Sequence, residues 1–156
     1  MHFEKIEILD WLKTAPEAPI DLTVSGMSCP ASLSELGISI EDLPITGNNS
    51  YGYKPLRDHL ANIYKVSSAC LTISAGASIS NFATLSVLHK MVNCITVEEP
   101  AYEPFVKVAK AISGSLPERI KRYPENQYHI DPDSAELLDG RSRILLIANP
   151  HNPTGI

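Results

Sequence analysis

Cysteine is scarce in this sequence, and its scarcity excludes several kinds of small domain. The 156 residues include three cysteines, Cys29, Cys70 and Cys94, an odd number without close spacing. Disulfide frameworks of secreted domains and clustered zinc sites need paired or closely spaced cysteines. We therefore predict reduced, mostly buried cysteines in a cytoplasmic protein, and no metal site.

An excess of basic residues is also missing. The 13 Lys and Arg residues stand against 18 Asp and Glu residues, which gives a net charge of -5. Proteins that bind nucleic acids normally carry a basic face that neutralises phosphates. The composition therefore argues against a nucleic-acid partner, and solubility alone explains acidity of this size.

Long apolar runs are absent as well. No segment is long enough to span a bilayer. Charged residues interrupt the first turns of the chain, which the apolar stretch of a secretion signal does not tolerate; they are Glu4, Lys5, Glu7 and Asp10. A hydrophobic content of 44% with 20% charged residues is ordinary for a globular domain. We expect a folded cytoplasmic protein that does not associate with membranes.

The first part of the sequence predicts two helices separated by an irregular arm. Apolar residues three apart indicate a short helix from Phe3 to Leu12, and a second helix follows Pro55. The stretch between them is rich in Ser, Gly and Pro, which favours irregular structure. We predict an N-terminal helix and arm over residues 1–45 and a main domain over residues 46–156.

From Cys70 onward, short β-branched runs alternate with helical patterns, which is typical of a parallel sheet covered by helices. Strands are predicted at residues 71–74, 94–97, around 120 and at 144–148. Apolar stripes predict helices over Ile79–Met91 and Glu103–Ile112. The sequence therefore predicts an α/β fold, a three-layer α/β/α domain with a mostly parallel sheet.

The first candidate site is the turn from Gly76 to Ser78, where a predicted strand gives way to a helix. Unpaired N–H groups at a helix start can hold a phosphate, and the Ser78 hydroxyl can donate one more hydrogen bond. The same residues suit a plain strand-to-helix turn with an N-cap. This segment alone leaves both interpretations open, and it matches neither a P-loop nor a dinucleotide-binding fingerprint.

The second candidate site is VEEPAYEPF, residues 97–105, at the predicted carboxyl edge of the sheet. Ligands of open α/β sheets gather at that edge. Tyr102 can stack on a planar heteroaromatic ring there, or it can serve only for packing. We interpret the acidic pair Glu98 and Glu99 as a solvated strand end and not as a catalytic dyad.

The third candidate site is NPHNPTG, Asn149–Gly155, which follows the predicted strand at 144–148. Two prolines and a glycine restrict the backbone, and such a loop can aim one side chain at a ligand. We predict that this side chain is Asn152, with a plain turn as the alternative. His151 receives no role, because a histidine in a turn is usually exposed or hydrogen-bonded.

Taken in order, the three segments resemble the class I/II aminotransferases of fold-type I, which depend on pyridoxal 5′-phosphate (PLP). The resemblance covers most of residues 46–156, including YGYKPLRDHLANIYKVSS, and implies an incomplete PLP-binding large domain. It also implies contacts to the cofactor: Gly76, Ala77 and Ser78 to its phosphate, Tyr102 to its pyridine ring, and Asn152 to its phenolic oxygen. SGMSCP resembles the loop that closes over the substrate, with Gly26 as the matching residue.

Two departures limit what the resemblance implies. Many relatives place a tyrosine shortly before the equivalent of Gly52, whereas Gly47 and Asn48 occupy that stretch here, and Tyr51 is not expected to replace it. In the family, the lysine that binds the cofactor covalently lies further along than Ile156, as do an aspartate at the pyridine nitrogen and an arginine that binds the substrate carboxylate. We therefore expect an N-terminal fragment that is inactive alone and supplies no catalytic residue.

The resemblance implies that the complete protein transfers an amino group between an amino acid and a 2-oxo acid, as a homodimer. A PLP-dependent lyase or decarboxylase of the same fold uses the same residues. A truncated, non-catalytic binding or dimerisation module is an alternative from another class. A nucleotide-binding domain is a weaker one, because Gly76 lacks the companion glycines of that fingerprint.

Overall fold

The computed structural model describes residues 2–23, 32–43, 46–47, 50–133 and 140–156. The chain forms two compact units, a larger one of Met1–Thr14 with Ser74–Ile156 and a smaller one of Ala15–Ile73. Gly26, the predicted substrate-loop residue, and Cys29 lie outside the described residues. The predicted domain boundary between residues 45 and 46 stays a prediction.

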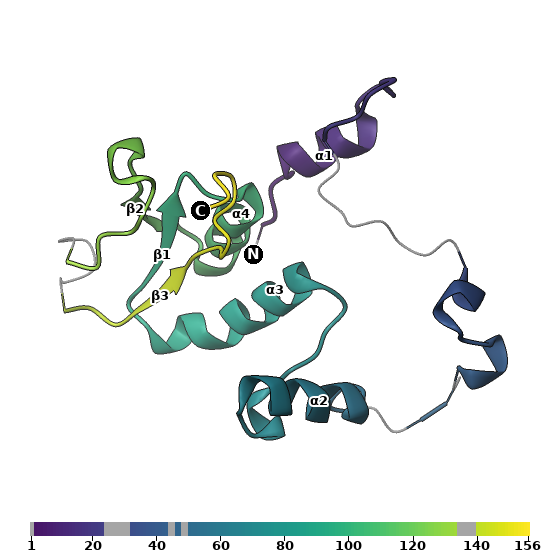
Figure 1. The fold of residues 1–156 in the computed structure, drawn as a ribbon. Helices are drawn as coiled ribbons and strands as arrows, with labels where there is room; N and C mark the ends of the chain where they lie inside the picture. The colour runs from purple at the N-terminus through teal and green to yellow at the C-terminus, as the bar shows by residue number, and fades with distance from the viewer. Residues whose placement is uncertain (1, 24–31, 44–45, 48–49, 134–139) are drawn as a thin grey trace. The chain divides into compact units, whose positions relative to one another are not determined.

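The larger unit is built on a parallel sheet. β1 (Cys94–Glu99) lies between β2 (Glu118–Lys121) and β3 (Arg143–Leu146) and runs parallel to both (Figure 1). Residues 95–98 of the central strand are all buried, although successive side chains point to opposite faces. The predicted α/β class with a parallel sheet is confirmed, and the three strands lie at or beside their predicted positions.

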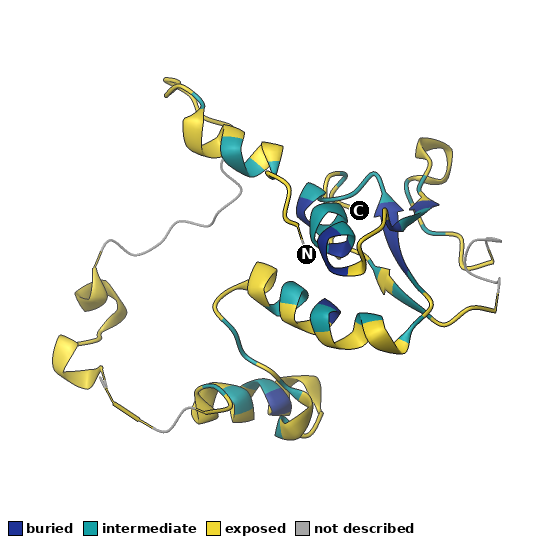
Figure 2. Cartoon of the chain, turned by 180° about the vertical axis from the view of Figure 1, so that it is seen from behind, coloured by how far each residue is buried: buried dark blue, intermediate teal, exposed yellow. Residues whose placement is uncertain are grey.

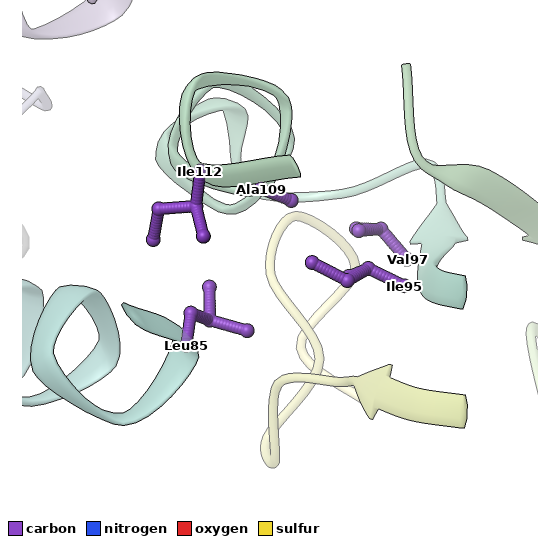
Figure 3. Close-up of a cluster of buried hydrophobic side chains, with 5 residues drawn as sticks. All are labelled: Leu85, Ile95, Val97, Ala109 and Ile112. Carbon is purple, nitrogen blue, oxygen red and sulfur yellow. The ribbon is translucent and has the colours of Figure 1, made fainter. Parts of the chain in front are cut away.

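The apolar core lies on the face of β1 that carries Ile95 and Val97. Helices α3 (Ala77–Leu88) and α4 (Glu103–Ser113) both contribute to it. Leu85 of α3 and Ala109 and Ile112 of α4 cluster with these two strand residues (Figure 3). The predicted stripe of α4 is therefore confirmed.

The predicted stripe of α3 is confirmed only near the middle of the helix. Leu85 is 2% exposed, whereas Ile79 is 53% exposed. Met91, predicted to share the stripe, lies in the 3₁₀ turn η4 (His89–Met91) and is 73% exposed. A helix that is apolar on most of its surface does not reveal from its sequence which side faces the core.

Residues 71–74 form no strand, so this prediction is wrong. Leu71 has an extended backbone, with φ −114° and ψ 131°, but residues 71–74 pair with no strand in the described part of the chain. An extended segment becomes a strand only through hydrogen bonds to a neighbour, and its own residues cannot show whether that neighbour is present. Cys70, predicted to be buried, is exposed and free, and Cys94 is half-buried and free.

In its described residues, the smaller unit contains one α-helix, α2 (Lys54–Tyr64), and three 3₁₀ turns, η1 (Leu33–Leu36), η2 (Ile40–Asp42) and η3 (Ser68–Cys70). Proline in the first turn of α2 fits the prediction, since the missing N–H costs nothing there. Ala61 is the buried residue of this helix, and Leu56 and Ile63 are exposed. Most of α2 is coloured exposed or intermediate in Figure 2. The described part of this unit therefore has little core of its own.

Polar contacts hold the N-terminal helix α1 (Glu7–Thr14) against α4. The Glu103 carboxylate, in the first turn of α4, accepts the N–H of Glu7 at 3.0 Å and the N–H of Ile8 at 2.9 Å. Lys107 Nζ donates to the Lys5 carbonyl at 2.8 Å. The hydrogen bond from the Ile8 N–H is the main reason why the pKa of Glu103 lies below its ordinary value.

Acidification is expected to weaken the contact between α1 and α4. A lowered folded-state pKa means that Glu103 adds stability above the ordinary Glu value of about 4.3, and that this is lost as the pH falls through the lower folded value. The effect is small because the contact is partly solvated. Fluorescence of Trp11, the only tryptophan and a residue of α1, should change below pH about 4.

The variant Glu103→Gln should reduce the amplitude of this acid transition, because glutamine does not titrate. Glu17→Gln, at an exposed position outside α1 and α4, is the matched control and should leave the transition intact. A fluorescence signal that is the same in Glu103→Gln and in the unaltered chain throughout the acid range would contradict the assignment.

Candidate functional site

A cavity of about 210 Å³ lies in the larger unit, where α3 begins, α4 begins and β3 ends. It is lined by residues of α3, of the α4 start, and of β3 with its following loop: Ala77, Ser78, Asn81, Leu85, Tyr102, Pro104, Phe105, Val108, Leu146, Ala148 and Asn152. Four of the five residues predicted to contact a cofactor are among them, and the fifth, Gly76, directly precedes Ala77. The structure therefore brings the three predicted segments to one cavity, and their role as ligands stays a prediction.

The N-terminus of α3, at Ala77 and Ser78, lines this cavity. Gly76 adopts φ 92° and ψ 159°, a conformation that other residues rarely adopt. The first backbone hydrogen bond of the helix runs from Ser80 N–H to the Gly76 carbonyl at 3.2 Å. In the described part of the chain, no hydrogen bond uses the N–H of Ala77 or Ser78. These donors and the positive end of the helix suit an anion such as a phosphate.

Tyr102 is held in place at the start of α4. Its carbonyl accepts the N–H of Phe105 at 3.0 Å. The two rings meet edge to face, with centroids 5.8 Å apart and planes at 80°. This is a preferred geometry for aromatic pairs, so Phe105 restrains the orientation of the Tyr102 ring. An oriented ring beside apolar walls is suited to stacking on a flat ligand.

The loop after β3 buries His151 and leaves Asn152 at the surface of the cavity. His151 is 2% exposed, and its carbonyl accepts the N–H of Gly155 at 2.6 Å. Its own N–H donates to the Ile156 carbonyl at 2.6 Å. These two bonds close the turn around His151, and Asn152 follows it directly. Asn152 is therefore the residue of this loop that lines the cavity, and its contact with a ligand stays a prediction.

Glu98 is fully buried, which contradicts the interpretation of the acidic pair as a solvated strand end. One carboxylate oxygen accepts the Ala148 N–H at 2.7 Å. The other lies 2.5 Å from Arg122 Nη2, a close ion pair without hydrogen-bond alignment. The neighbouring Glu99 is 46% exposed in its side chain, as expected. The sequence could not show the difference, because Arg122 follows another strand and only the fold brings it to Glu98.

The family of the chain can be assigned from residues 46–156. A family model described as aminotransferase class I and II matches this range. The chain belongs to the class I and II aminotransferase family. This aminotransferase chain is also 28% identical over 105 residues to the methionine aminotransferase of Escherichia coli (strain K12). The aligned stretch is 67% of the chain and 24% of that relative, so the chain spans about a quarter of the relative's length.

Asn81 is the polar lining residue that sequence analysis missed in this aminotransferase chain. It lies three residues after Ser78 on α3, so both side chains share one face of the helix, and helical spacing could have revealed it. Among the described residues, no three His, Cys, Asp or Glu side chains gather as metal ligands would. None of the helices described is long and apolar enough to cross a membrane.

Proposed function

We propose that this chain provides the PLP-binding part of an aminotransferase. The observation that carries the proposal is the one cavity lined by a helix N-terminus, an aromatic ring and an asparagine amide. PLP presents a phosphate, a flat pyridine ring and a phenolic oxygen, and each has a matching group there. When bound, PLP supplies an electron sink for negative charge formed at the α-carbon of the substrate.

The start of α3 is the proposed phosphate site. The N–H groups of Ala77 and Ser78 and the Ser78 hydroxyl donate to the phosphate oxygens, and Gly76 leaves room for a close approach. Hydrogen bonds to a charged group contribute about 1.5–3 kcal/mol each, and the helix end adds about 0.3–1 kcal/mol. These donors are preorganised, since the helix fixes their direction before any ligand arrives.

Tyr102 and Asn152 are the proposed contacts to the ring. Stacking on Tyr102 contributes about 0.5–1.5 kcal/mol beyond the burial of area, and the apolar walls exclude water from the ring. The Asn152 amide donates to the phenolic oxygen and stabilises its negative charge. Gly26 remains the proposed residue of the substrate loop.

The complete enzyme is proposed to transfer an amino group between an amino acid and a 2-oxo acid, as a cytoplasmic homodimer. Membership of the family and 28% identity to a methionine aminotransferase support this reaction class.

The 156-residue chain by itself is expected to be catalytically silent. No lysine lines the cavity in the described part of the chain, so no amine is placed to hold the cofactor or to move the α-proton. Formation of 2-oxo acid from PLP and an amino acid should therefore match that of free PLP at the same concentration. Turnover well above the free-cofactor rate would contradict this expectation.

Binding of pyridoxamine 5′-phosphate tests the proposed site directly. This cofactor form lacks the aldehyde, so it cannot condense with surface lysines and report a false site. A ³¹P NMR titration should show one saturable site on the chain. Because a single hydrogen bond to the charged phosphate contributes about 1.5–3 kcal/mol, pyridoxamine without phosphate, titrated by calorimetry, should bind more weakly by at least about 10-fold. Equal affinity for the two compounds, or no binding of either, would rule out the phosphate site.

A further inference from the structure

The imidazole of His151 joins two loops that both contribute to the cavity. Its Nε2 lies 3.0 Å from the carbonyl oxygen of Pro100, two residues before Tyr102. Its Nδ1 lies 2.6 Å from Thr154 Oγ1, within its own loop. The side chain is fully buried, so neither contact competes with water. One ring therefore connects the backbone beside Asn152 to the backbone beside Tyr102.

The partners fix which ring nitrogen carries hydrogen. A carbonyl oxygen can only accept, so Nε2 must carry a proton and donate it to Pro100. In the neutral ring, Nδ1 then accepts the hydroxyl proton of Thr154. Both polar atoms of the imidazole are satisfied in this arrangement, which a buried histidine requires.

A second buried contact supports the same loop from the other end. The Glu98 carboxylate accepts a hydrogen bond from the Ala148 N–H at 2.7 Å, at the point where the loop follows β3. Its other oxygen lies 3.7 Å from His151 Nε2. The loop carrying Asn152 is thus tied at its beginning by Glu98 of β1 and at its middle by His151.

We propose that His151 is a positioning residue, which sets the place of Asn152 relative to Tyr102 through the hydrogen bond to Pro100. This role rests on the proposed function, because the spacing matters only if Asn152 and Tyr102 both contact the same cofactor ring. It assigns His151 no contact with substrate or cofactor. The residue acts through the loop, and its effect on ligand binding should require Asn152.

The tautomer of His151 can be read in the 156-residue chain without any ligand. Histidine ¹⁵N NMR should show a protonated Nε2, and its proton should exchange slowly with water because the ring is buried. A ring protonated only at Nδ1, or an imidazole proton that exchanges as fast as that of a free histidine, would overturn the proposal. This outcome does not depend on whether the chain binds a cofactor.

A double-mutant cycle then tests whether His151 acts through Asn152. His151→Leu removes both hydrogen bonds and should weaken binding of pyridoxamine 5′-phosphate by about tenfold in the unaltered chain. In the Asn152→Ala background the same change should have almost no effect. His151→Gln keeps an N–H donor near the Nε2 position and should recover most of the affinity.

The outcomes separate this inference from the proposed function. Equal losses from His151→Leu in both backgrounds would show a general structural effect and would overturn the positioning role. If the unaltered chain binds no pyridoxamine 5′-phosphate, the proposed function fails. The side-chain amide resonance of Asn152 in the free chain then decides: it should shift in His151→Leu and stay in place in His151→Gln. An unmoved resonance in both variants overturns the positioning role.

Discussion

Replacement of Glu98 by alanine is expected to lower the free energy of unfolding of the larger unit by about 3–5 kcal/mol. The carboxylate is fully buried and faces Arg122, whose side chain is 8% exposed. Removing the acid leaves a guanidinium with no opposite charge in a buried site, and it leaves the Ala148 N–H without its acceptor. Urea denaturation followed by circular dichroism measures the loss.

Two further variants make the Glu98 result specific. Glu99→Ala changes the same residue type one position later, where the carboxylate is 46% exposed and 3.6 Å from Arg119, and it should cost little. In Glu98→Met with Arg122→Met, both charges are gone, so much of the stability should return. Equal effects of Glu98→Ala and Glu99→Ala would contradict the buried ion pair.

Loss of the Asn152 amide is expected to weaken binding of pyridoxamine 5′-phosphate about 10- to 100-fold in the variant Asn152→Ala, which corresponds to about 1.5–3 kcal/mol for a hydrogen bond to a charged oxygen. Tyr102→Leu should cost less, about 2- to 10-fold, because leucine keeps part of the apolar contact and loses the stacking. A calorimetric or ³¹P NMR titration gives both values. The loss in Asn152→Ala should be the larger one, because Asn152 is proposed to bond to the charged phenolic oxygen, whereas Tyr102 only stacks on the ring.

The same loop supplies the control for Asn152. Asn149 is exposed, precedes a proline as Asn152 does, and does not line the cavity. Asn149→Ala should therefore bind pyridoxamine 5′-phosphate as the unaltered chain does. A loss of the same size at both positions would show that the loop responds as a whole and that Asn152 makes no contact of its own.

Local patterns in the sequence were sufficient for most of the larger unit. The β-branched run at Cys94–Val97 and the apolar spacing of Glu103–Ile112 correctly placed β1 and α4. Turn residues such as Gly76 marked the start of α3, because only a glycine adopts that backbone without cost. Patterns of this kind depend on neighbours within a few residues, which the sequence shows directly.

Features that depend on distant partners could not be predicted. Glu98 and Glu99 are neighbouring residues of the same type, and the position of Arg122 beside Glu98 distinguishes them. His151 looked like an ordinary turn residue until the fold placed the Pro100 carbonyl against its ring. Residues 71–74 have strand-forming side chains but pair with no strand in the described part of the chain. For Glu98 and His151 the deciding contact joins residues far apart in the chain, and for residues 71–74 a partner strand is missing among the described residues.

The most direct test is a map of the ¹H–¹⁵N shifts of the labelled chain as pyridoxamine 5′-phosphate is added. The amides of Ala77 and Ser78, the backbone at Tyr102 and the side-chain amide of Asn152 should shift together, with a single dissociation constant. Shifts confined to one of these three segments, or centred on residues that do not line the cavity, would contradict it.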